Sequence, residues 1–217
     1  MISHTPEPIP DRPTPGSLGD IALNYQARWG LNIIPGEVEL KEPYKYGWGY
    51  HLFSQARHGL PIPPHELSQF WESYPESNIL MFPGAVSGVD VIDVDNKPGK
   101  KSGFDTLEEL GLSWVIEEGR KVSTPTGNGI HLYFKHTVDG PNKKPSGTGL
   151  ELFCAGNQYV LMPPSAYLDT DVSPHQMGFY TCNDFNLDGF NPVPQDLIDF
   201  FMEKGLNSPD QREWVPS

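Results

Sequence analysis

The run VDVIDVDNKPGK, residues 89–100, limits the folds open to this chain more than any other stretch. Apolar residues dominate its first half, as in a buried strand, and successive side chains of a strand point to opposite faces of the sheet. Asp93 and Asp95 therefore share one face of the predicted strand, while Ile92 and Val94 share the other. Unpaired carboxylates are costly to bury, so the fold must provide something that neutralises them.

Two interpretations of this aspartate pair stay open. Side chains two apart on a strand face lie within ~7 Å, so a divalent cation between Asp93 and Asp95 would remove their mutual repulsion. Alternatively, the strand ends in a polar turn of Asn96, Pro98 and Gly99, where both carboxylates are solvated. An Asp-x-Asp sequence this short occurs often by chance, so the pair alone favours neither interpretation.

Length and charge limit the functions that the chain can have. Its 217 residues, 37% of them hydrophobic, are enough to bury the core of one domain. The formal net charge of −13 repels nucleic acid over most of the surface, so contact with DNA needs local basic clusters or metal-bridged phosphates. The two cysteines, Cys154 and Cys182, are too few for a disulfide framework and are expected to be core or half-buried thiols.

The N-terminal stretch indicates neither a membrane anchor nor an exported protein. Residues 1–16 are rich in proline and polar residues, which predicts a disordered arm without the charged start and apolar centre of a signal peptide. No apolar run of the sequence is long enough to cross a bilayer. We expect an intracellular, cytoplasmic protein that has no membrane partner.

The spacing of apolar residues predicts helices mixed with strands. Helical periodicity starts at Ser17 and stops before Gly30, and a second stripe, ending at Tyr74, runs through 63–75; the aromatic stretch 41–50 is predicted as a loop. Two further helices are predicted at 103–110 and 192–205, and strands at 31–35, 78–82, 88–95, 120–124, 129–135, 150–154, 158–162 and 178–182. This pattern predicts an α+β domain over 17–205, built on a mostly antiparallel or mixed sheet, with a tail at 206–217.

A second candidate stretch is TPTGNGIHLYFK, residues 124–135. It reads as a glycine-rich turn leading into a strand on which His131 and Lys135 share the polar face. Backbone N–H groups of such a turn can form a concave nest for phosphate oxygens, with an imidazole N–H as an added donor. The alternative is an ordinary hairpin turn followed by a partly exposed histidine.

A third candidate is Glu151, an acid within the predicted strand at 150–154. Leu150 and Leu152 occupy the opposite face of that strand, so Glu151 alone could be a solvent-facing residue of a sheet with one wet face. Three strand-borne acids together with a histidine-bearing glycine turn are, however, the components of a metal-dependent nucleotidyl transfer site.

The order of these motifs resembles the three catalytic motifs of the archaeo-eukaryotic primase superfamily. The likeness is closest to the bifunctional primase–polymerase domains of plasmid and phage replication proteins. It extends from the helix at Ser17 to the end of the last predicted helix, through the segments KEPYKYGW, SNILMFPGAVSGVDVIDVD, GFDTLEELG, STPTGNGIHLYF and PVPQDLIDFF. The resemblance implies a primase–polymerase fold: a small α/β N-terminal module packed on an RRM-like module with a mixed or antiparallel sheet. The active site is expected in the cleft between the two modules.

The resemblance also implies roles for individual residues. Asp93, Asp95 and Glu151 are expected to hold Mg²⁺ or Mn²⁺ in a two-metal site, and His131 to orient phosphate as the fourth catalytic residue. The implied nucleotide-binding set is Thr126, Gly127, Asn128, Gly129, His131 and Lys135. The sequence departs from the family pattern in three places: Glu151 stands where Asp is frequent, Thr126 where Ser is common, and Asn128 interrupts the glycines.

The implied partners are a DNA template and primer, dNTPs, and NTPs as second candidate substrates. Relatives commonly continue into a helical template-binding domain and a helicase, which makes both candidate partners in plasmid, phage or mobile-element replication. Some plasmid relatives carry a zinc-binding element that two distant cysteines cannot rebuild, so no structural zinc is expected.

Two rival functions stay open on the sequence. A glycosyltransferase can use an Asp-x-Asp pair to hold a metal on a nucleotide-sugar diphosphate, although Glu151 and His131 would then have no role. A catalytically idle member of the primase fold could bind nucleotide or single-stranded DNA within a replication complex, although retention of all three acids favours an active enzyme.

Overall fold

The computed structural model describes residues 17–125, 127–170, 175–183 and 185–207. The predicted arm at 1–16, and all of the predicted tail after residue 207, lie outside the described residues. The helices are α1 (Ser17–Trp29), α2 (Gly47–Arg57), α3 (Pro64–Ser73), α4 (Gly103–Glu109), α5 (Val115–Glu118) and α6 (Gln195–Lys204). The strands are β1 (Ile33–Gly36), β2 (Asn78–Met81), β3 (Val89–Val94), β4 (Arg120–Ser123), β5 (Ile130–Lys135), β6 (Lys143–Lys144), β7 (Leu150–Phe153), β8 (Val160–Leu161), β9 (Ala166–Asp169), β10 (Gln176–Phe179) and β11 (Leu206–Asn207).

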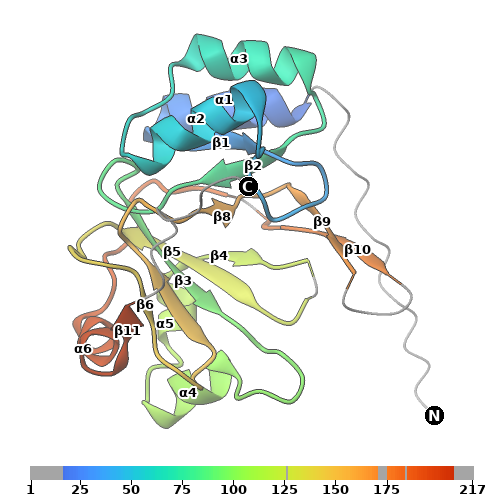
Figure 1. The fold of residues 1–217 in the computed structure, drawn as a ribbon. Helices are drawn as coiled ribbons and strands as arrows, with labels where there is room; N and C mark the ends of the chain where they lie inside the picture. The colour runs from blue at the N-terminus through green and yellow to red at the C-terminus, as the bar shows by residue number, and fades with distance from the viewer. Residues whose placement is uncertain (1–16, 126, 171–174, 184, 208–217) are drawn as a thin grey trace.

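The described strands form three sheets, and all pairings between named strands are antiparallel. A three-stranded sheet has the order β1-β2-β8, and α1, α2 and α3 stack above it (Figure 1). A six-stranded sheet has the order β11-β6-β7-β3-β5-β4, and β9 pairs with β10 in a separate ribbon. This arrangement confirms the predicted α+β class with a mostly antiparallel sheet.

Two hydrophobic cores meet at β3. Val89 and Val91 belong to a core that includes the helices around the three-stranded sheet, whereas Ile92 and Val94 belong to a second core beneath α4, α5 and α6. The alternation of side chains along a strand produces this division, because successive residues face opposite ways. The predicted assignment of faces in the 89–95 run is therefore confirmed.

One predicted loop is partly wrong, because α2 begins inside the stretch 41–50. Its glycines favoured a loop, but Gly49 is buried in the helix, and a Cβ there would collide with the side chain of Tyr44. Glycine thus permits a close approach rather than a chain reversal. The helix from Pro64 ends earlier than the predicted stripe, and Tyr74 at its C-terminus is half-exposed instead of buried.

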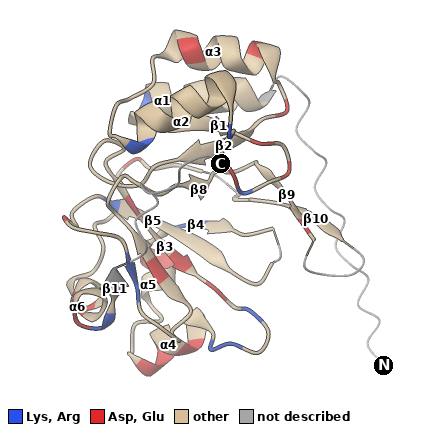
Figure 2. Cartoon of the chain, in the orientation of Figure 1, with Lys and Arg blue, Asp and Glu red and all other residues tan. Residues whose placement is uncertain are grey.

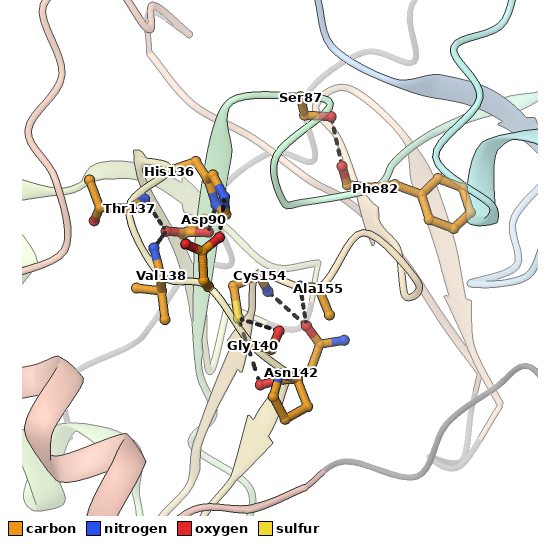
Figure 3. A network of polar contacts seen from close by, with 12 residues as sticks. Phe82, Ser87, Asp90, His136, Thr137, Val138, Gly140, Asn142, Cys154 and Ala155 are labelled. Atoms are coloured by element: carbon orange, nitrogen blue, oxygen red, sulfur yellow. Dashed lines mark hydrogen bonds and ion pairs between the residues drawn. The ribbon is translucent and has the colours of Figure 1, made fainter.

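A fully buried acid, Asp90, holds the chain that follows β5 against the start of β3 (Figure 3). Its Oδ1 lies 2.6 Å from Nδ1 of His136, and its Oδ2 accepts hydrogen bonds from the backbone N–H groups of Thr137 and Val138 at 2.9 and 3.2 Å. A buried carboxylate needs such partners, since it would otherwise lose its hydration without compensation. Asp90 thus has a structural role. Asp93, the other acid of β3, points to the opposite face of the sheet.

The two cysteines form no disulfide, and Cys154 is buried and Cys182 half-buried, as predicted. Among the helices of the described segments, none combines the length and the apolar character that a membrane crossing requires.

Candidate active site

Three polar residues lie in one row across the middle of the six-stranded sheet. β3 pairs with β7 on one side and β5 on the other, and Asp93 lies directly opposite both Glu151 and His131. Directly opposed residues of an antiparallel pair project from the same face of the sheet. The backbone register therefore places an acid, an acid and an imidazole next to one another, although they are far apart in the sequence.

Asp95 follows the end of β3 and is held by its backbone. Its N–H donates to the carbonyl of Gly149 at 2.8 Å, and its carbonyl accepts from the N–H of Gly103 at 2.7 Å. Gly149 has a φ of +69°, and a Cβ there would collide with the backbone nitrogen of Gly103. A glycine is therefore required where the chains before α4 and β7 meet beside Asp95.

Gly149→Ala is expected to lower the free energy of unfolding by roughly 2–4 kcal/mol, the sum of a left-handed backbone and a steric clash. Gly147→Ala is the matched control, because Gly147 has a φ of +70° but open space around the added Cβ. Urea denaturation of both variants measures the difference. Equal losses in the two would mean that the contact with Gly103 contributes nothing.

A cavity of about 650 Å³ opens onto this row. Its lining comes from β3 and the loop after it, from β5 and the turn before it, from β7, β8 and β9, and from the residue after β10, with one lysine from the loop that precedes α2. The lining residues are Lys41, Asp93, Asp95, Asn96, Lys97, Pro98, Thr124, Asn128, Gly129, His131, Phe153, Tyr159, Val160, Leu161, Tyr167, Asp169 and Tyr180. The cavity therefore joins residues of the six-stranded sheet to residues of the other two sheets.

The structure brings most of the predicted site residues to this cavity, but not all. Asp93, Asp95, Asn128, Gly129 and His131 line it. Of the other four predicted residues, Glu151, Gly127 and Lys135 are not in the lining, and Thr126 lies outside the described residues.

The three described residues that do not line the cavity each lie in a different part of the sheet or turn. Glu151 shares the face of Asp93, but its carboxylate is ion-paired with Lys144. Lys135 lies at the far end of β5, four residues from His131 or ~13 Å along a strand. The N–H of Gly127 donates within the turn to the carbonyl of Thr124, so that donor is used internally.

Burial and neighbouring acids strongly raise the pKa of Asp93. Desolvation, followed by the charge of Asp95 and then that of Glu151, raises the pKa of Asp93 to about 7, while Lys97 and Lys41 partly oppose the rise. Ionised carboxylates that share a site repel one another, so one of them keeps its proton to an unusually high pH. A bound cation would lower the electrostatic repulsion between these carboxylates.

His131 is buried and electrically neutral at pH 7. Desolvation, reinforced by Lys41, lowers the pKa of its imidazole to about 4. Its Nε2 is 3.7 Å from Oδ1 of Asp93, too far for a hydrogen bond, and its Nδ1 has no hydrogen-bond partner among the described residues. The ring packs against Tyr180 with centroids 5.4 Å apart. A buried polar atom of this kind is suited to a ligand that enters the cavity.

Two lysines accompany the acids. Lys97 Nζ lies 2.7 Å from Oδ2 of Asp95, and Lys144 contacts Glu151. Figure 2 shows acidic residues on β3 and basic residues on the loop that leads from it to α4. Lys143 and Lys144 form β6, and the pairing of β6 with β7 brings Lys144 to Glu151. The two ion pairs offset part of the acidic charge.

The acidic side chains of the site are of the kind that binds a hard divalent cation. Their arrangement, however, does not form a complete metal site. Carboxylate oxygens are the ligands that Mg²⁺ and Mn²⁺ prefer, and Asp93, Asp95 and Glu151 lie at one end of β3 and its neighbour β7. Within the described residues, however, no three His, Cys, Asp or Glu side chains form a group that could hold a metal ion. Binding would thus require Lys97 and Lys144 to leave their carboxylates.

Comparison with known families gives one match. The family model described as bifunctional DNA primase/polymerase, N-terminal (Prim-Pol), matches residues 22–182, which include the whole row and every cavity-lining residue. No curated protein matches the chain.

Proposed function

Because the chain belongs to the bifunctional DNA primase/polymerase family, we propose that it transfers nucleotides from dNTPs or NTPs to a 3′-hydroxyl under the direction of a DNA template. Membership implies primase/polymerase activity, and the row of Asp93, Glu151 and His131 beside a cavity of about 650 Å³ is the observation that supports it here. The reaction would take place in that cavity, between the six-stranded sheet and β8 and β9.

In this proposal Asp93, Asp95 and Glu151 hold Mg²⁺ or Mn²⁺. When bound, these ions supply positive charge for the triphosphate and lower the pKa of the attacking hydroxyl. The half-buried Asp93 would give up its proton to bind such an ion, since a cation offsets the repulsion that raises its pKa. Lys97 and Lys144, released from Asp95 and Glu151, become free to contact phosphate.

His131 orients phosphate rather than acting as a base. A neutral imidazole donates one N–H, and burial at the wall of the cavity fixes its direction. Asn128 and Gly129 line the same cavity and would extend the phosphate contacts. Lys135 is left out of this set, because it lies at the other end of β5.

Primer extension tests the proposal directly. The full chain is incubated with a labelled primer–template and single dNTPs or NTPs, with and without Mg²⁺ or Mn²⁺. Template-directed, metal-dependent extension is expected. A chain that binds single-stranded DNA or nucleotide and extends nothing would instead be the catalytically idle member of the fold.

His131→Ala is expected to weaken the apparent affinity for dNTP roughly tenfold, the value of about one hydrogen bond to a charged group. Binding of the primer–template should be unchanged, because His131 faces the cavity rather than the outer surface. A dNTP titration in single-turnover extension measures the first quantity, and fluorescence anisotropy with labelled DNA measures the second. His65→Ala, on the exposed side of α3, is the control; an unchanged dNTP affinity in His131→Ala would assign His131 a packing role only.

We further propose that the chain acts in plasmid, phage or mobile-element replication. Its net charge of −13 leaves few cationic surfaces to grip DNA, so a helicase or helical template-binding domain is the partner that would hold the template.

A further inference from the structure

Lys41 reaches the cavity from a part of the chain that none of the three motifs includes. It belongs to the loop between β1 and α2 and lines the cavity with Tyr167 of β9. Its Nζ lies 4.1 Å from the centre of the Tyr167 ring, within the range of a cation–π contact. The side chain is also accessible to solvent, so a ligand in the cavity can reach its ammonium.

The loop that carries Lys41 is fixed to the same strand as Tyr167. The buried amide of Asn78 donates to the carbonyls of Leu40 at 3.0 Å and Ala166 at 2.8 Å, and so ties the loop to the start of β9. The carbonyl of Glu39 accepts from the N–H of Leu168 at 2.9 Å. Glu39 has a φ of +62°, a left-handed conformation that residues with side chains rarely adopt. Backbone contacts on both sides of Tyr167 therefore hold Lys41 in place.

The charges around the cavity distinguish Lys41 from the other lysine there. In the part of the lining that the structure describes, the lysines are Lys41 and Lys97. Lys97 is ion-paired with Asp95, whereas the ammonium of Lys41 lies over an aromatic ring. An aromatic face holds an ammonium without cancelling its charge, and the charge remains available to an anion. His131 is neutral and adds no positive charge.

We propose that Lys41 is a phosphate-binding residue, whose ammonium contacts the triphosphate of the incoming nucleotide. The inference rests on the proposed function and adds to it a cation from outside the three motifs. The site would therefore add Lys41, from the β1–α2 loop, to the positive charge of bound metal and of the released Lys97 and Lys144. The ligand chemistry is that of a linear triphosphate anion.

Isothermal titration of the full chain with dATP and Mg²⁺, and separately with inorganic tripolyphosphate, tests this assignment without DNA and without turnover. Lys41→Ala is expected to weaken both ligands about tenfold or more, since a charge-assisted contact to phosphate is lost. Lys41→Arg keeps the charge and the stacking on Tyr167, so its affinities should stay within about threefold of the parent chain.

Lys45→Ala is the matched control. Lys45 lies four residues further along the same segment, pairs with Glu42 and is not among the described residues that line the cavity. The variant removes the same charge, so an unspecific electrostatic effect would weaken binding in both variants. Only Lys41→Ala is expected to weaken binding of tripolyphosphate.

The inference is overturned if Lys41→Ala binds tripolyphosphate as the parent chain does, or if it loses affinity only for a single-stranded oligonucleotide. Primer extension by the parent chain tests the proposed function separately. A chain that extends primers while Lys41→Ala binds dATP normally would keep the function and lose this inference. A chain that binds tripolyphosphate through Lys41 and extends nothing would lose the function and keep the phosphate site.

Discussion

Asp93→Asn is expected to lower the rate of nucleotide incorporation about a thousandfold, since ~4 kcal/mol of charge stabilisation in the transition state corresponds to three decades of rate. Asparagine has nearly the same shape as aspartate, so the register of β3 with β5 and β7 should be kept. Only the negative charge at the centre of the row is lost. Single-turnover primer extension at saturating Mg²⁺ or Mn²⁺ measures the effect.

Asp199→Asn is the control for this experiment. Asp199 is an exposed residue of α6, hydrogen-bonded to Gln195, and its substitution changes the net charge of the chain by the same amount. Its rate should equal that of the parent chain. Near-normal incorporation by Asp93→Asn would remove Asp93 from the proposed metal ligands.

Asp93→Asn is also expected to stabilise the metal-free protein at high pH. The pKa of Asp93 is about 7 in the folded protein against an ordinary value of 3.8, so the folded state holds a proton between these pH values that the unfolded chain has released. The free energy of unfolding therefore falls as the pH rises from about 4 to about 7, and the penalty stays constant above. Asparagine carries no such charge, so the gain at pH 8 is on the order of 4 kcal/mol.

Urea denaturation in EDTA at pH 4 and pH 8 measures this gain, and Asp90→Ala gives the contrast. Asp90 lies three residues earlier on β3, but its carboxylate has partners on His136, Thr137 and Val138. Its removal should cost about 3 kcal/mol, because it leaves buried donors unpaired. A gain for Asp93→Asn that is equal at both pH values, or a loss at pH 8, would contradict the pKa argument.

The faces of the central strands could be predicted from the sequence. Apolar residues alternate with Asp93 and Asp95 in one run and with His131 in another, and a period of two leaves little freedom in how a strand is buried. The row itself could not be predicted, because alternation fixes the face of each residue but not which residue lies opposite. The pairing of Asp93 with Glu151 and His131 needs the order and register of three strands.

Other parts of the site carry no local signal. Lys41 lies two residues before a proline, and its approach to Tyr167 depends on contacts of Asn78 that span distant parts of the chain. Lys144 belongs to no motif of the sequence, and it meets Glu151 because β6 pairs with β7. Side chains brought together by long-range pairing lack the short spacings from which motifs are recognised.

The row of Asp93, Glu151 and His131 runs across the strands rather than along one of them. Its intervals are set by interstrand hydrogen bonding, which places neighbouring strands ~4.8 Å apart whatever side chains they carry. Substitutions within either hydrophobic core can then change how readily the protein unfolds without changing how far apart these three groups lie. Activity should consequently tolerate a wide range of core sequences, and it should disappear together with the backbone pairing rather than decline by degrees.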